Sequence, residues 1–282
     1  MRSALDSHLA RGIYMERQDC IYFVYKRSQM TEAKRVYGEL KQEIVTCVLS
    51  PGLSISEQEM CDRYNASRTP VREACRRLCD ESLMQMTPFR GYSIPALTIE
   101  EYRNLHELQT TVEPAVAALA AERATPAQIK EIENWASYEY VMGEKNSYYT
   151  FLEWNRNFHI CIAAASRNQA FLDVVRNVQT RLMRYYYLVI AMDSYGTELV
   201  EEHHDLVRAI KSGNPELARQ RAGEHLSNTG RRSMNVDLRS ANYSSERLLS
   251  DDDSDWLLKA PSNIRKVKKR LPAARRRKLL PR

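Results

Sequence analysis

Residues 67–74 read Ser67-Arg68-Thr69-Pro70-Val71-Arg72-Glu73-Ala74, and this stretch predicts the start of an arginine-bearing helix. Ser67 or Thr69 can cap a helix, and Pro70 is tolerated in its first turn. At 100° per residue the apolar side chains fall on one face, which predicts a core-facing side: Val71, Ala74, Cys75 and Leu78. Beside that face lie three guanidinium groups and a hydroxyl: Arg68, Arg72, Arg76 and Thr69.

Two further helices are predicted upstream of this arginine-bearing helix. Apolar residues recur at three- and four-residue steps, which indicates an amphipathic helix that Pro51-Gly52 ends: Tyr37, Leu40, Ile44, Val45 and Val48. Ser56 followed by Glu59 is a capping box for a short helix to about Tyr64. A turn at residues 65–66 then leads into the arginine-bearing helix.

Downstream, two short extended runs flank Pro88-Phe89-Arg90-Gly91 and predict a hairpin between Met84 and Pro95. Helix, turn, arginine-bearing helix and hairpin in this order predict a winged helix-turn-helix over residues 31–98. Such a helix enters the major groove of DNA, where arginine pairs with guanine. Arg90 and Gly91 could approach a phosphate or the minor groove. The alternative is a surface helix with solvated arginines.

Residues 99–235 are predicted to form an all-α antiparallel bundle without strands. Thr125-Pro126 with Gln128 is a strong helix start, while Gly213 ends one helix and Asn214-Pro215 begins the next. We expect six helices, over residues 100–123, 125–144, 147–166, 168–192, 195–212 and 214–234. The fold class is therefore mainly α.

The chain of 282 residues is long enough for two ordinary domains. Residues 1–30 are expected to be an N-terminal extension, and residues 236–282 a disordered tail that is acidic at first and then basic. Residues 265–282 contain ten Lys and Arg and no acidic residue. Because this charge of +10 exceeds the net charge of +6 of the whole chain, the rest of the chain is mildly acidic. DNA binding must therefore be argued from where the arginines lie. The basic tail could add phosphate contacts, or it could be an extension without that role.

The run over 67–74 with Arg77-Leu78 resembles the signature of GntR-family regulators. Pro51-Gly52 and Arg90-Gly91 also fall where that family has them. The resemblance implies that DNA is contacted by the arginine-bearing helix, here called the reading helix, and by the hairpin, here called the wing. The contacting residues would be Arg68, Thr69, Arg72, Arg90 and Gly91. Gln58 departs from the family, because some members carry a basic contact residue there.

The second half resembles the FCD effector domain of the FadR subfamily. The residues that carry this resemblance are Val112-Glu113, the alanine-rich stretch 115–121, Asn155, Phe158-His159, Glu202-His203, Leu206, Ala209-Ile210, Ala218 and His225. Many members hold a divalent metal with an Asp and three His, and the metal helps to bind a small carboxylate. The resemblance therefore implies a metal set of Asn155, His159, His203 and His225.

The residues themselves support a metal site, since Asn155 and His159 lie four apart on one helix face. Three neutral imidazoles and an oxygen suit Zn²⁺ or Ni²⁺. The alternative is that each is an ordinary histidine near a core, and His204 competes with His203. Asn155 replaces the usual Asp, and an amide oxygen is a poorer ligand. Gln109 replaces an arginine that would pair with an anionic effector, so the effector is less anionic or Arg181 and Arg184 supply the charge.

Other classes of function are disfavoured by what the sequence lacks. No apolar run approaches the roughly 18–20 residues needed to cross a bilayer, so we expect a cytoplasmic protein without a membrane partner. No nucleophile elbow, H-E-x-x-H motif or phosphate loop occurs, which argues against an enzyme. The sequence predicts a homodimeric regulator, most simply a repressor, that binds operator DNA and an organic-acid effector. The alternative is a metal- or small-molecule-binding protein whose helix-turn-helix no longer binds DNA.

Overall fold

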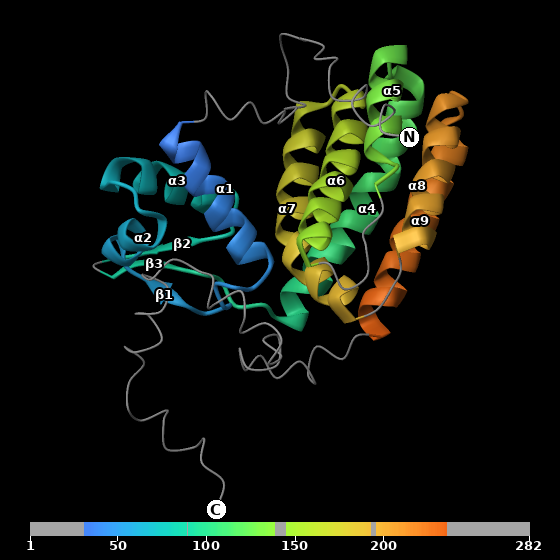
Figure 1. Ribbon diagram of the computed structural model, residues 1–282. Helices are drawn as coiled ribbons and strands as arrows, with labels where there is room; N and C mark the ends of the chain where they lie inside the picture. The colour runs from blue at the N-terminus through green and yellow to red at the C-terminus, as the bar shows by residue number, and fades with distance from the viewer. Residues whose placement is uncertain (1–30, 89, 139–144, 193–195, 236–282) are drawn as a thin grey trace, which may run out of the picture.

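A computed structural model describes residues 31–88, 90–138, 145–192 and 196–235 and places them in two lobes (Figure 1). The predicted extension 1–30, the tail 236–282 and Phe89 lie outside the described residues. The first lobe, here called the head, contains α1 (Glu32–Val45), β1 (Ser54–Ile55), α2 (Glu57–Tyr64), α3 (Arg68–Asp80), β2 (Gln85–Thr87) and β3 (Gly91–Ser93). The second, here called the bundle, contains α4 (Ile99–Arg123), α5 (Pro126–Trp135), α6 (Lys145–Ala165), α7 (Gln169–Met192), α8 (Gly196–Lys211) and α9 (Pro215–Asn235). The mainly helical fold, with a winged helix-turn-helix before an all-α bundle, is confirmed.

The first helix ends earlier than its apolar pattern predicted. α1 stops at Val45, and Thr46 turns its hydroxyl back onto the Gln42 carbonyl at 2.8 Å. Cys47 then adopts φ 57°, in the left-handed region, which takes the chain out of the helix. Val48, which we expected on the buried face, is therefore 43% exposed. Pro51-Gly52 belongs to the following turn and does not end the helix.

The helix-turn-helix itself is confirmed in detail. α2 starts at the predicted capping box, in which the Ser56 hydroxyl accepts from the Glu59 N–H and the Glu59 carboxylate accepts from the Ser56 N–H. Asn65 ends α2 in the left-handed conformation. Ser67 occupies the cap of α3 without a side-chain hydrogen bond. The predicted core face of α3 is fully buried and packs with α1 and α2: Val71, Ala74, Cys75 and Leu78.

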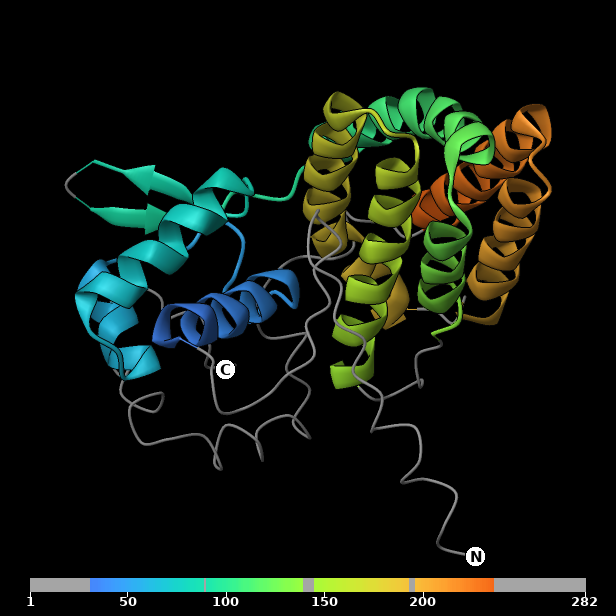
Figure 2. The same ribbon diagram turned by 90° about the horizontal axis from the view of Figure 1, so that it is seen from above.

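The wing is the predicted hairpin of β2 and β3, with an added strand that the sequence did not reveal. The three strands are antiparallel in the order β1-β3-β2, with Ile55 opposite Tyr92 and Met86 on the other side of Tyr92. β1 has only two residues, too few for an alternating pattern. The hairpin projects from the head on the side away from the bundle (Figure 2).

In the bundle, the helix predicted over 125–144 is wrong at its C-terminal end. α5 ends at Trp135, and the Ser137 hydroxyl donates to the Glu133 carbonyl. Tyr138 then stacks on Trp154 of α6, with ring centroids 5.1 Å apart. This aromatic contact draws the chain onto α6, so the helix does not continue; residues 139–144 lie outside the described part.

The head is packed against the bundle through α1. Val45 and Cys47 belong to one buried cluster with residues of α4, α6 and α7, among them Tyr102 and Leu182. The connection between the lobes is also held, because Arg184 donates to the Pro95 carbonyl at 2.8 Å and Tyr185 donates to the Thr98 carbonyl at 3.2 Å. Figures 1 and 2 show α1 as the head helix that lies beside α6 and α7.

Candidate metal centre and nucleic-acid interface

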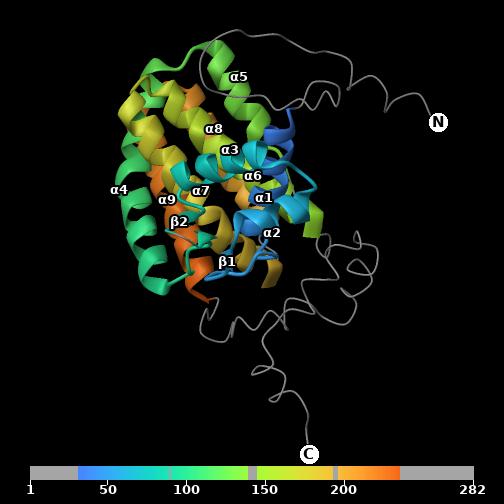
Figure 3. The same cartoon turned by 90° about the vertical axis from the view of Figure 1, so that its left-hand side faces the viewer.

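The cationic side of α3 is open to solvent. The side chains of Arg68 and Arg72 are 67% and 62% exposed, and Thr69 and Arg76 are also exposed. Figure 3 views the molecule from the side of the head and shows α2 and α3 in front of the bundle. The opposite, apolar face of α3 is buried within the head, whereas this cationic side is accessible to a partner.

Glu57 at the start of α2 orients two of these arginines. The Arg72 Nε donates to the Glu57 carboxylate at 2.7 Å, and the Arg68 Nε lies 3.7 Å from the other oxygen of Glu57. Gln58, the departure noted above, accepts from Arg68 at 3.4 Å. Since Glu57 engages Nε of Arg72, the two terminal nitrogens of that guanidinium remain available as a fork.

The remaining cations of the head divide into two kinds. Arg77 serves the fold, because its guanidinium lies 3.8 Å from the centroid of the Tyr37 ring and pairs with Glu81. Arg90 is exposed at the wing turn. Gly91 has φ 94°, and a Cβ there would lie 2.6 Å from the Ile55 carbonyl oxygen. The close approach of β1 alone therefore requires glycine at this position, whatever the wing contacts.

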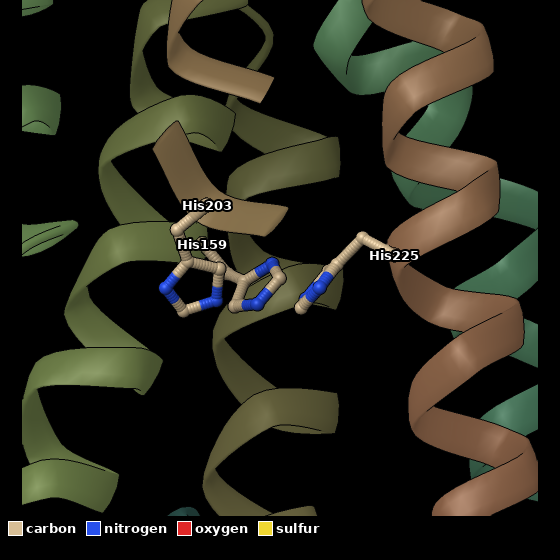
Figure 4. A group of neighbouring side chains, drawn as sticks. All are labelled: His159, His203 and His225. Atoms are coloured by element: carbon tan, nitrogen blue, oxygen red, sulfur yellow. The ribbon is translucent and has the colours of Figure 1, made fainter. Parts of the chain in front are cut away.

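Three histidines from three helices converge inside the bundle (Figure 4). His159 lies on α6, His203 on α8 and His225 on α9; each is at most 4% exposed, and one ring nitrogen from each lies within 4.8 Å of the others. The ring centroids of His203 and His225 are 4.8 Å apart. His204 is only half buried and stands outside the cluster, so the structure favours His203 over its neighbour.

Two buried carboxylates hold two of these imidazoles through Nδ1. His159 Nδ1 lies 2.7 Å from Glu113, and Gln179 donates to the same carboxylate at 2.7 Å. His225 Nδ1 lies 2.9 Å from Glu202, which also receives both terminal nitrogens of Arg232. A carboxylate on Nδ1 fixes the tautomer and leaves Nε2 as a metal ligand, and metal-bound histidines are commonly oriented in this way.

Burial and neighbouring charges keep two of the three imidazoles, those of His203 and His225, in a metal-binding form. Burial lowers the pKa of His203 well below its usual range, and His225 and His159 lower it further. Burial also lowers the pKa of His225, against the opposing effect of Glu202. Burial would raise the pKa of Glu202, but hydrogen bonds from His225 and Arg232 outweigh it and bring the value to about 2. At neutral pH His203 and His225 are thus neutral, with the ionised Glu202 behind His225, and a metal binds the neutral imidazole.

The residues fit a divalent metal. His203 Nε2 is a buried nitrogen without a hydrogen-bond partner among the described residues, and such a group is costly unless something binds it. Three nitrogen donors suit Zn²⁺ or Ni²⁺, with further positions left for oxygen ligands. The His159, His203 and His225 cluster can therefore hold a metal.

A cavity of about 470 Å³, including its opening to solvent, adjoins the cluster. His159 and His225 line it together with Asn155 and Gln109, two of the predicted site residues. Its other wall is apolar: Phe151, Leu152, Val189, Ile190, Leu199 and Leu226. Gln109 is 2% exposed and its oxygen accepts from the Tyr186 hydroxyl at 3.0 Å.

The structure does not bring the two proposed effector-binding arginines of α7 to this cavity. Arg181 pairs with Glu101 at 2.6 Å, Arg184 donates to Pro95, and neither lines the cavity. The arginine that does line it is Arg232, which sequence reasoning missed. Glu113 and Glu202 were quoted only for the resemblance, and their roles were missed too. Neither carboxylate is a helical neighbour of the histidine it holds, so no local spacing could reveal the pairing.

Among the helices that the structure describes, none combines the length and the apolar character of a membrane span.

Known proteins match both lobes. Residues 32–94 match the bacterial regulatory proteins of the gntR family, and residues 104–228 match the FCD domain. The HTH-type transcriptional repressor RspR of Escherichia coli is 26% identical over 223 residues, which cover 79% of this chain and 92% of that protein. The Nta operon transcriptional regulator of Aminobacter aminovorans is 30% identical over 132 residues, 47% of this chain and 62% of that protein.

Solved structures share the fold. Escherichia coli McbR/YncC matches with a TM-score of 0.60 at 19% identity, over 73% of this chain and 99% of that one. A transcriptional regulator of Rhodococcus sp. RHA1 matches with a TM-score of 0.57 at 20% identity, over 73% and 99%. The two family matches together span more than half of the 282 residues. The chain belongs to the GntR family, with an FCD domain of the FadR-like kind after its helix-turn-helix, and is a DNA-binding transcriptional regulator.

Proposed function

We propose that the protein is a homodimeric repressor whose operator affinity is set by a small carboxylate bound in the bundle. The observation that carries the proposal is the pairing of an open arginine face on α3 with a buried three-histidine cluster beside a cavity. Two reading helices would lie in successive major grooves of a near-palindromic operator. A ligand changes operator affinity only as far as it favours one pose of the heads.

On the DNA side, the reading face comprises Arg68, Thr69, Arg72 and Arg76, with Arg90 and Gly91 from the wing. Arg72 is placed to contact a guanine, since Glu57 holds its Nε and leaves its terminal fork free. Arg68 and Arg76 flank it on the same exposed side and supply a base or phosphate contact. The wing tip adds a cation at the edge of the interface.

On the sensing side, His159, His203 and His225 hold the ion and Asn155 offers an oxygen from the cavity wall. When bound, the metal supplies a positive charge that attracts the carboxylate of the effector. Gln109 offers a hydrogen bond, and the apolar wall packs against the body of the effector. Arg232 already has both terminal nitrogens on Glu202, so it contributes less to anion binding than a free arginine would.

Arg72→Ala tests the DNA-reading face. DNA selected from a random pool by the wild-type protein serves as the operator, and binding is measured by gel shift. Loss of a guanine contact should weaken binding by about 1–3 kcal/mol. Arg219→Ala is the matched control, because Arg219 is an exposed α9 arginine paired with Glu216. Equal affinity of Arg72→Ala and wild type would remove Arg72 from the interface, and failure to select any DNA would refute the regulator itself.

His203→Ala tests the metal centre. We expect about one Zn²⁺ or Ni²⁺ per chain in dialysed wild-type protein, measured by elemental analysis, and loss of that ion in His203→Ala. His204→Ala is the matched control, since it removes the adjacent histidine outside the cluster. Retention of the ion in His203→Ala, or its loss in His204→Ala, would contradict the assignment.

A further inference from the structure

Lys41 lies at the boundary between the head and the bundle. It belongs to α1, is only 4% exposed, and lies beside the Tyr37 ring at 5.9 Å. Lysine is almost never this buried unless its ammonium is paired, because an unpaired charge in a desolvated place is costly. The identity of its partners therefore matters for how the two lobes are held.

The ammonium of Lys41 has two carboxylate partners, one in each lobe. Glu153 of α6, in the bundle, lies 2.9 Å from Nζ. Glu81, the residue that ends α3 in the head, lies 3.9 Å from Nζ through its Oε2. One buried cation thus stands between the helix that carries His159 and the helix that carries the reading arginines.

Glu81 can accept more than it does. Its Oε1 accepts from the Tyr37 hydroxyl at 2.6 Å, whereas its Oε2 is buried and has no hydrogen-bond partner among the described residues. An unsatisfied carboxylate oxygen of this kind is costly. A movement of the Lys41 ammonium by about an ångström would satisfy it and would leave Glu153 with its Tyr149 hydrogen bond at 3.3 Å.

We propose that Lys41 is a coupling residue that shifts between Glu153 and Glu81 and so transmits the state of the histidine site on α6 to the end of α3. The inference rests on the proposed function and adds its route of regulation. A lysine has a flexible stem and three donors, so both arrangements keep the ammonium paired. Two discrete arrangements of one buried group are what coupling between sites requires.

The two glutamates offer variants that fix opposite arrangements. Glu153→Gln removes the bundle charge and holds Lys41 on Glu81, whereas Glu81→Gln removes the head charge and holds Lys41 on Glu153. Both changes are isosteric. Lys41→Met removes the shared cation, and Lys34→Met is its matched control, because Lys34 is an exposed lysine on the same helix. Circular dichroism is used to check the fold of each full-length variant. If Lys41→Met does not fold, Glu153→Gln and Glu81→Gln alone provide the test.

The measurement is operator affinity with excess EDTA and with Zn²⁺, using DNA selected by the wild-type protein. Zn²⁺ should change wild-type affinity by about 5–150-fold, the usual range of coupling between sites. In Lys41→Met, Glu153→Gln and Glu81→Gln this ratio should fall to within about twofold of one, while Lys34→Met keeps the wild-type ratio. The operator affinities of Glu153→Gln and Glu81→Gln should differ from each other by about the factor that separates the Zn²⁺ and EDTA affinities of the wild-type protein.

The proposal is overturned if Lys41→Met, or the glutamine variants, keep the wild-type ratio, or if Zn²⁺ leaves wild-type affinity unchanged although the protein binds both metal and DNA. The two glutamine variants having equal affinity would also overturn it. The proposed function fails on other observations, namely a wild-type protein that takes up no metal or selects no DNA.

Discussion

Two glycines of α9 show how strongly a single position can be constrained by its neighbour. A Cβ on Gly230 would lie 2.4 Å from His106 Nε2 on α4, whereas a Cβ on Gly223 would meet nothing within 4 Å. The His106 ring cannot move away freely, because it stacks on Tyr102 with an interplanar angle of 7°. Gly230 is thus a point of close approach between α4 and α9, and Gly223 is not.

We expect Gly230→Ala and Gly223→Ala to change stability in opposite directions. The first should lower the free energy of unfolding by about 1–3 kcal/mol through overpacking. The second should raise it by about 0.5–1 kcal/mol, because alanine is favoured over glycine in a helix interior. Urea unfolding followed by circular dichroism measures both. Equal stabilisation by the two changes would mean that His106 yields at little cost.

Positions that depend on local spacing could be predicted from the sequence. The exposed arginines and the buried face of α3 follow from the helical period, and the three histidines that converge in the bundle each stand in a motif: His159, His203 and His225. Their partners could not be predicted in the same way. Glu57 meets Arg72, and Glu202 meets His225, only after two helices have packed. Such contacts are set by tertiary structure, which periodicity does not encode.

For the helices and strands, the sequence predicted where helices begin better than where they end. The capping boxes of α2 and α5 begin helices where the sequence predicted. α5 nevertheless ends at Trp135, because Tyr138 stacks on Trp154, and α1 ends at Val45, because Cys47 takes a left-handed conformation. In both cases a contact or a backbone turn overrides residues that could have continued the helix.

The pairing of α4 with α9 should make stability depend on pH through His106. Burial lowers the pKa of His106 below its ordinary value of 6.5. His106 therefore binds a proton more weakly in the folded chain than in the unfolded chain. The free energy of unfolding is highest above about pH 6.5 and falls as the pH drops below that value. Urea unfolding between roughly pH 7.5 and 5.5 should show a smaller loss in His106→Gln than in wild type. An identical loss would mean that His106 contributes nothing to the acid sensitivity.

For the whole molecule, the decisive feature is a core shared by both lobes. The head has its own buried cluster around α1, α2 and α3, and the bundle has another around Phe158 and Leu206. A third cluster joins them, since Val45 and Cys47 of the head pack with Tyr102, Leu182 and Tyr186 of the bundle. The Lys41–Glu153 ion pair crosses the same boundary. The bundle and the head are therefore packed together and not merely tethered, which is what a signal between them would require.

A shared core predicts that head and bundle unfold together. Calorimetry of the wild-type protein should give one transition, with calorimetric and van't Hoff enthalpies in agreement. Val45→Asp puts a charge into the shared cluster and leaves the head's own cluster intact, so it should separate the unfolding into two transitions. Val48→Asp makes the same chemical change three residues later at an exposed position and should keep the single transition. If Val45→Asp also melted as one unit, the head would be coupled to the bundle by contacts other than this cluster.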